Sequence, residues 1–266
     1  MDKKSRRFNI ILGAILTGIV VIPAIIGIFI TPYHPETMDP SNKLSGISFA
    51  HIMGCDNFGR DILSRVMVGS SVTLFIACGT VLIGVVIGTI IGAFTGYFGG
   101  ILDEIIMRIN DAIFAFPSIL LALVIIGLFG TGKYQVMIAL GIAFIPSYAR
   151  IVRSEFIRCK NMDYVKSAKL AGVFDFRIIF VHIMPNAFSV LISSIMIGFN
   201  NAVLAEAGLS FLGIGVQPPD ASLGRMLSEA QTYLFSSPTY ALFPGITIIL
   251  MVLGFALLGE GLKERR

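Results

Sequence analysis

Charged residues are scarce in this 266-residue sequence, where only 14% of the residues are Asp, Glu, Lys or Arg. A soluble globular domain usually carries about 25%. The chain is 55% hydrophobic, with a mean hydropathy of +0.86. Several apolar runs reach the length of about 20 residues that a helix needs to span a bilayer. The sequence therefore predicts an all-α, polytopic membrane protein.

Cysteine and histidine are also rare, with three of each. The cysteines are odd in number and have no metal-like spacing: Cys55, Cys78 and Cys159. A disulfide framework is therefore not expected. The histidines are too scattered for a metal site: His34, His51 and His182. We expect no catalytic residue, no metal and no cofactor on this chain.

Six apolar segments could cross the membrane, at about 8–30, 71–98, 112–130, 134–150, 187–208 and 240–259. The first could instead be read as a signal peptide. Its apolar run at 10–30 is longer than the usual 7–15 residues of such a region, and no A-x-A cleavage site follows. We interpret it as a retained first span.

The distribution of Lys and Arg predicts the orientation of the spans. With the N-terminus inside, 15 of these residues fall in inside segments and 5 in outside segments. Cytoplasmic loops carry such an excess, so both termini are predicted to be cytoplasmic. The net charge of +4 is thereby a topology signal and does not indicate nucleic-acid binding.

The segment between the fourth and fifth spans, 151–186, is long, basic and cytoplasmic in this topology. Asp163 is a possible helix N-cap, and Gly172 can end that helix in a left-handed conformation. A second helix is expected from Asp175 to His182, with a boundary before Pro185. A plain connector needs about 2 to 8 residues. The length and charge of this loop indicate a docking surface for a soluble partner.

The stretch YVKSAKLAGVFDFRIIFVHIMPN, at 164–186, resembles the EAA loop of ABC importer permeases. The motif positions are occupied by Lys166, Ser167 and Ala168 in place of Glu-Ala-Ala, then by Gly172, His182 and Pro185. The stretches at 53–74, 91–123, 202–227 and 241–266 resemble signatures of the dipeptide, oligopeptide and nickel permeases, in their C-type subunit.

This resemblance implies a transmembrane permease subunit of an ATP-driven importer, without covalent chemistry of its own, in the cell (inner or cytoplasmic) membrane. Residues 1–70 would form an N-terminal span and an extracytoplasmic loop, and residues 71–266 the permease domain. The implied partners are a second, B-type permease, two ABC ATPases that carry ATP and Mg, an external substrate-binding protein and membrane lipid, but no nucleic acid. Di- and oligopeptides are the expected substrates, with nickel or a metal chelate as the alternative.

A different class, the ATP-independent secondary transporters, is the other alternative. These proteins usually contain inverted repeats and ionisable residues near the membrane midplane. Neither is evident in this sequence.

The resemblance and the residue types together give four sets of candidate residues. The ATPase-coupling set is Asp163, Tyr164, Lys166, Ser167, Ala168, Gly172, His182 and Pro185. A pathway or outer-gate set is Asn200, Asn201 and Glu206, with an interfacial position as the alternative for Glu206. An external set is Asp56, Arg60, Asp61 and Arg65, which form either a solvated helix with local ion pairs or a docking contact. A helix-packing set is Gly84, Gly88, Gly92 and Gly96, which could pack within the subunit or against the second permease.

The sequence GLFGTGK, at 127–133, matches most of a phosphate-binding P-loop. That motif needs a preceding strand and a Ser or Thr after the Lys. Tyr134 follows here, so ATP hydrolysis is expected on another chain.

Overall fold

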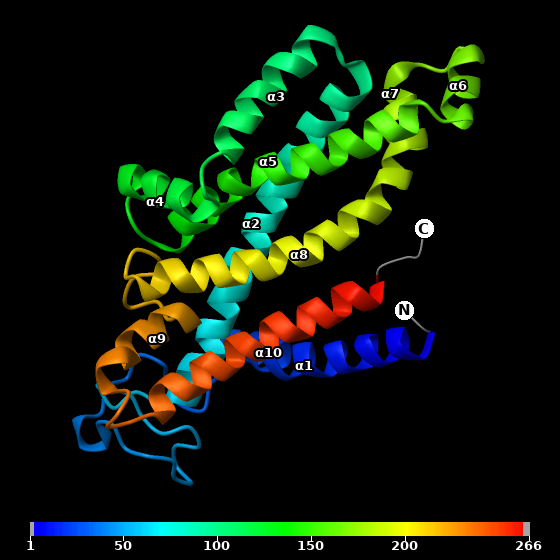
Figure 1. The fold of residues 1–266 in the computed structure, drawn as a ribbon. Helices are drawn as coiled ribbons and strands as arrows, with labels where there is room; N and C mark the ends of the chain where they lie inside the picture. The colour runs from blue at the N-terminus through cyan, green and yellow to red at the C-terminus, as the bar shows by residue number, and fades with distance from the viewer. Residues whose placement is uncertain (1–2, 263–266) are drawn as a thin grey trace.

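The computed structural model describes residues 3–262, and within this range the chain folds into helices without a named strand (Figure 1). The helices are α1 (Lys3–Phe29), α2 (Ile62–Phe98), α3 (Gly100–Phe114), α4 (Ser118–Phe129), α5 (Lys133–Lys160), α6 (Asp163–Leu170), α7 (Asp175–Arg177), α8 (Met184–Phe211), α9 (Leu223–Ala230) and α10 (Thr239–Leu262). A π-helical turn, Ile178–Ile183, joins α7 to α8. Lys263, Arg265 and Arg266, which enter the charge count, lie outside the described residues.

Among the described residues, five helices are long and apolar enough to cross a membrane, and the number is six if a bent pair of helices is counted as one span. The five are Arg6–Phe29, α2, α5, the continuous helical stretch Asp175–Phe211, and α10. The count of six agrees with the predicted number of spans. The bent pair is α3 and α4, which meet at 89°.

The third predicted span, 112–130, is therefore not one continuous helix, because it includes the end of α3, the bend and the whole of α4. The chain breaks at residues 115–117, which we call the elbow. Pro117 lacks a backbone N–H and disfavours helical geometry at Phe116, so the helix cannot continue through this point.

The second span begins nine residues earlier than predicted, at Ile62 instead of residue 71. Asp61 caps the helix by accepting a hydrogen bond from the backbone N–H of Ser64 at 2.8 Å. The charged residues before position 71 suggested a loop. In the structure they lie on or beside the helix and are buried, and α2 runs through the boundary drawn at residue 70.

The helices form an elongated bundle with two distinct ends (Figure 1). We call one the termini end, because Lys3, Leu262, α6 and α7 lie there. We call the other the loop end, because it carries the segment 30–61 and α9. α1 and α10 pack side by side, and α2 packs along α5. The predicted topology would place the termini end in the cytoplasm.

Glycines allow the backbones of α2 and α5 to touch. A Cβ atom on Gly92 would lie 2.4 Å from the carbonyl oxygen of Ala149, and one on Gly96 would lie 2.7 Å from that of Arg153. A Cβ atom on Gly88 would lie 2.7 Å from the Cβ of Tyr148. The ridge of glycines at four-residue spacing therefore faces another helix of the same chain.

The segment that begins at α6 differs from the prediction at both of its ends, while its glycine turn is confirmed. Asp163 is not the N-cap of α6: the N-cap is Met162, no side chain caps the helix, and Asp163 is the first helical residue. Gly172 has φ +75°, and the N–H groups of Gly172 and Val173 donate to the carbonyls of Lys169 and Ala168, which is a Schellman cap. The expected boundary at Pro185 does not exist, because Asp175–Phe211 is helical throughout. The π-helical turn just before Pro185 is wider than an α-helical one, which accommodates the proline ring and its missing donor.

Candidate functional site

A groove of about 690 Å³ opens between the elbow and the middle of α5 and α8. Its lining is uncharged and mostly apolar, and five polar side chains are set among the aromatic and aliphatic ones. The aromatic residues are Phe114, Phe116 and Phe144, and the aliphatic side chains include Ile119, Ile151, Ile197 and Leu204. The polar residues are Ser118, Ser147, Tyr148, Ser194 and Asn201. Among the described residues, no Asp, Glu, Lys, Arg or His side chain lines it. Polar side chains within membrane-spanning helices usually face a bundle interior or a water-filled cavity. The groove is therefore the candidate surface of a transport pathway.

The structure separates the three residues predicted for the pathway. Asn201 is exposed on the groove, and its side-chain amide has no hydrogen-bond partner within residues 3–262. Asn200 is half-buried, does not line the groove, and its Oδ1 atom is enclosed without a partner in the described part of the chain.

Glu206 is fully buried and does not line the groove, so it has no exposed interfacial position in this structure, and its role in a pathway stays a prediction. Its Oε1 accepts a hydrogen bond from the Ser210 hydroxyl at 2.7 Å. Glu206 is five positions after Asn201 on α8. At about 100° per residue, the two side chains therefore point about 140° apart around the helix axis. Only one of them can face the groove.

We call the predicted ATPase-docking loop, residues 151–186, the coupling segment. Its helices α6 and α7 project from the termini end of the bundle (Figure 1). Within this segment, Val165 and Ala168 are buried, whereas Lys166 and Asp163 form an exposed ion pair at 3.6 Å. His182 is half-buried, with Nδ1 3.3 Å from the carbonyl of Arg177, so it is part of the fold of this segment. Most of the remaining predicted coupling residues are exposed: Tyr164, Ser167, Gly172 and Pro185.

The coupling segment is tied to the end of α2 by Tyr97. The Tyr97 hydroxyl donates a hydrogen bond to Asp175, and the Lys160 ammonium donates one to the Tyr97 carbonyl. The Lys169 ammonium lies 4.8 Å from the centre of the Tyr97 ring. Because α2 also packs on α5, a force on the coupling segment would reach the groove through both helices.

Two exposed apolar residues of this segment escaped the sequence analysis. Leu170 is 90% exposed at the end of α6, and Phe174 is 83% exposed just before α7. A contiguous apolar patch on a protein surface marks an interaction site, whereas a single exposed apolar residue does not. Leu170 and Phe174 are four positions apart in the chain, which makes the pair a candidate for such a patch. The sequence did contain a signal for them, because two large apolar residues flank Gly172 in a polar loop.

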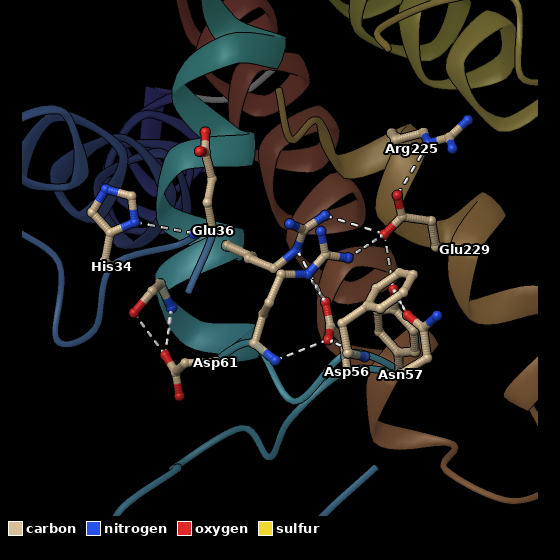
Figure 2. A network of polar contacts seen from close by, with 12 residues as sticks. His34, Glu36, Asp56, Asn57, Asp61, Arg225 and Glu229 are labelled. Carbon is tan, nitrogen blue, oxygen red and sulfur yellow. Dashed lines mark hydrogen bonds and ion pairs between the residues drawn. The ribbon is translucent and has the colours of Figure 1, made fainter. Parts of the chain in front are cut away.

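At the loop end, the predicted docking residues form a buried network of charges (Figure 2). The Asp56 carboxylate accepts from Arg60 Nε at 2.6 Å. Arg60 and Arg65 each donate to Oε2 of Glu229 at 3.1 Å. Arg225 donates to Oε1 of Glu229, also at 3.1 Å. The network joins the chain before α2 to α9.

The four predicted docking residues are therefore not a solvated helix. Asp56 and Arg65 are at most 1% exposed, and Arg60 and Asp61 are at most 6% exposed. Asp61 is occupied as the cap of α2 and lies 2.9 Å from Nδ1 of His51. The predicted local ion pair is present between Asp56 and Arg60. These side chains are buried in the structure, so they are not available for contact with a docking partner.

The acidity of Glu229 follows from this network. Burial opposes ionisation of its carboxyl group, but the charges of Arg65 and Arg60 and the hydrogen bonds from Tyr240 and Arg225 outweigh burial. The pKa of Glu229 is lowered as a result, and the carboxylate is the ionised centre of the network.

The P-loop-like stretch lies between two helices, because α4 ends at Phe129 and α5 begins at Lys133. A P-loop follows a strand. Lys133 forms an ion pair with Asp220 at 3.0 Å instead. Within residues 3–262, no group of three or more His, Cys, Asp or Glu side chains is placed to hold a metal ion.

The chain was compared with known families and sequences. Residues 84–265 match a family described as "Binding-protein-dependent transport system inner membrane component". The dipeptide transport system permease protein DppC of Alkalihalophilus pseudofirmus is 38% identical over 261 residues, which cover 98% of this chain and 86% of that protein. The glutathione transport system permease protein GsiD of Shigella flexneri is 42% identical over 253 residues, covering 95% and 84%.

The fold also matches a solved structure. A chain of the MetNI methionine ABC transporter, in an inward-facing conformation, aligns with a TM-score of 0.61. The alignment covers 74% of this chain and 93% of that chain, at 18% sequence identity. At this identity the match concerns the fold alone.

Proposed function

The chain belongs to the family of binding-protein-dependent transport system inner membrane components, and it is a permease subunit of an ABC importer; we propose that it imports di- and oligopeptides. The uncharged groove between the elbow, α5 and α8, with its five polar side chains on an otherwise apolar lining, is the observation that carries this proposal. Peptide groups are neutral and need hydrogen-bond partners, which serine, tyrosine and asparagine side chains supply. The dipeptide and glutathione permeases among its relatives support the same substrate class.

The proposed assembly contains two permeases, of which this chain is one half. An external binding protein delivers the peptide at the loop end, and two ATPases that bind ATP and Mg dock at the termini end. ATP-driven closure of the ATPases moves the coupling segments, and the movement reaches the groove through Tyr97 and α2. This route is supported by the contacts of Tyr97 with Asp175, Lys160 and Lys169.

Uptake in the host strain tests the substrate class. We expect deletion of this gene to abolish ATP-dependent uptake of labelled di- or oligopeptides, and the restored gene to return it. Radioactive nickel is offered to the same cells in parallel. Loss of nickel uptake alone would replace peptide by metal as the substrate, and uptake that persists without ATP would indicate a secondary transporter.

The exposed apolar pair of the coupling segment gives a second prediction. Replacing both Leu170 and Phe174 by serine is expected to weaken the copurification of the ATPases by more than tenfold. Removing an anchor at the centre of an interface costs about 2 kcal/mol or more, and 1.4 kcal/mol is already tenfold. The thermal stability of the chain alone should not fall, because both side chains are largely exposed.

Phe235→Ser is the matched control for this pair. Phe235 is fully exposed near the loop end, far along the chain from the coupling segment. Its replacement should leave ATPase binding unchanged. Equal ATPase binding by the Leu170→Ser/Phe174→Ser protein and the wild type would contradict the assignment of this docking surface.

A further inference from the structure

Tyr148 occupies a slot where α2, α5 and α8 meet, and it is only 3% exposed. A Cβ atom on Gly84 would lie 3.1 Å from its ring, and a Cβ atom on Gly88 would lie 2.7 Å from its own Cβ. On α8, a Cβ atom on Gly198 would lie 1.9 Å from its hydroxyl oxygen. Three glycines from two helices thus make room for this one side chain.

The hydroxyl of Tyr148 is not explained by packing. It is fully enclosed and has no hydrogen-bond partner within the described residues. A buried hydroxyl without a partner is costly, and such groups in native structures usually have a functional or strain-related reason. Phenylalanine would fill the same slot without that cost. The hydroxyl therefore calls for a partner that other conformations or ligands provide.

Tyr148 and Gly198 both line the groove, together with Ser147, Ser194 and Asn201. The hydroxyl lies against Gly198, at the boundary between α5 and α8. A displacement of α8 away from α5 would uncover the hydroxyl on the groove side. Gly198 contributes no side chain to this contact, so nothing on Gly198 itself would block the hydroxyl after such a displacement.

We propose that Tyr148 is a specificity-determining residue of the transport pathway, whose hydroxyl binds a peptide group of the substrate when α5 and α8 separate. This inference rests on the proposed function and adds the part of the substrate that is recognised. A phenolic hydroxyl both donates and accepts hydrogen bonds, and a peptide group offers both a carbonyl and an N–H. The groove would then select for the peptide main chain and be indifferent to the charge of substrate side chains, since its own lining is uncharged.

The experiment uses the complete transporter with its binding protein in liposomes, and Tyr148→Phe as the variant. The readout is the amount of labelled dipeptide delivered per ATP hydrolysed, measured beside the thermal midpoint of the assembled complex. We expect the delivery ratio to fall about fivefold to tenfold, as for the loss of one hydrogen bond. The thermal midpoint should stay equal or rise, because the variant removes an unpartnered buried hydroxyl.

Tyr134→Phe is the matched control, because Tyr134 lies on the same helix, is 54% exposed and is not part of the groove. It should keep the wild-type delivery ratio. An unchanged ratio in Tyr148→Phe would overturn the inference. A fall in both delivery and thermal midpoint would also overturn it, since the hydroxyl would then have a structural partner. If the wild-type transporter itself delivers no peptide, the proposed function fails, and the role of Tyr148 fails with it.

Discussion

Replacement of Gly92 by leucine is expected to prevent stable assembly of the helical bundle. A Cβ atom at this position would lie 2.4 Å from the carbonyl oxygen of Ala149 and 2.8 Å from the backbone nitrogen of Arg153. Both are backbone atoms of α5, so no side chain can rotate to relieve the clash. The expected cost exceeds about 4 kcal/mol, which is exceptional for a single substitution. The amount of protein in the membrane and its thermal midpoint in detergent measure the effect.

Gly127→Leu is the control for this prediction. Gly127 is an exposed residue of α4, and a Cβ atom there would meet nothing within 4 Å. The substitution should be neutral or slightly stabilising, since glycine costs about 1 kcal/mol in a helix relative to better helix formers. A Gly92→Leu protein with the wild-type thermal midpoint would show that α2 and α5 do not approach this closely.

Replacement of Glu229 by alanine should have the second largest effect. It would leave Arg60, Arg65 and Arg225 without the carboxylate that all three contact at 3.1 Å. Breaking a buried ion pair by removing one partner costs about 3–5 kcal/mol, because the remaining charge stays buried. We expect a loss of this size in the free energy of unfolding of the purified protein. The contacts between α9 and the chain before α2 should loosen first.

Asp220→Ala is the comparison for the Glu229 variant. Asp220 also pairs with a cation, Lys133, at 3.0 Å, but its side chain is 42% exposed. An exposed pair contributes about 0–1 kcal/mol. If the two substitutions destabilise the protein equally, burial is not what makes the Glu229 network important.

The contribution of Glu229 to stability should also depend on pH, in a direction that follows from its lowered pKa. The pKa of Glu229 is lowered in the folded chain, so its contribution to stability is present above the ordinary range of glutamate, about 4.3. That contribution is lost as the pH falls through the lower pKa of the folded state. The difference in stability between the wild type and a Glu229→Gln variant should therefore shrink as the solution is acidified below this range.

Local composition explains the parts of the fold that the sequence predicted. A bilayer requires a continuous apolar run for each crossing and satisfies backbone groups only within helices, so the spans can be read from the chain itself. The capping role of Gly172 is equally local, since it depends on one φ angle and two backbone hydrogen bonds. The four-residue glycine ridge predicted a close helix contact, and the tertiary structure named α5 as the partner.

The errors at the charged loop and on α8 arise because the contacts that decide them lie far away in the sequence. Arg60 and Arg65 looked like solvated charges, because their carboxylate partner Glu229 is 169 and 164 positions distant. Glu206 and Asn201 looked equivalent on one span, because the direction in which α8 faces the groove is set by its packing.

The sequence by itself determined the class of the protein and its family, and it predicted six spans, of which the structure contains five or six as candidates. It also predicted where a coupling segment would lie. Each of these depends on composition, spacing or motif within a short stretch of chain. Only the tertiary structure decided which polar residues face the groove, that the loop end is closed by a buried charge network, and that Tyr148 keeps an unpartnered hydroxyl behind Gly198. These features depend on contacts between helices that are far apart in the sequence. No short stretch of the chain contains both partners of such a contact, so only the packed structure shows which atoms meet.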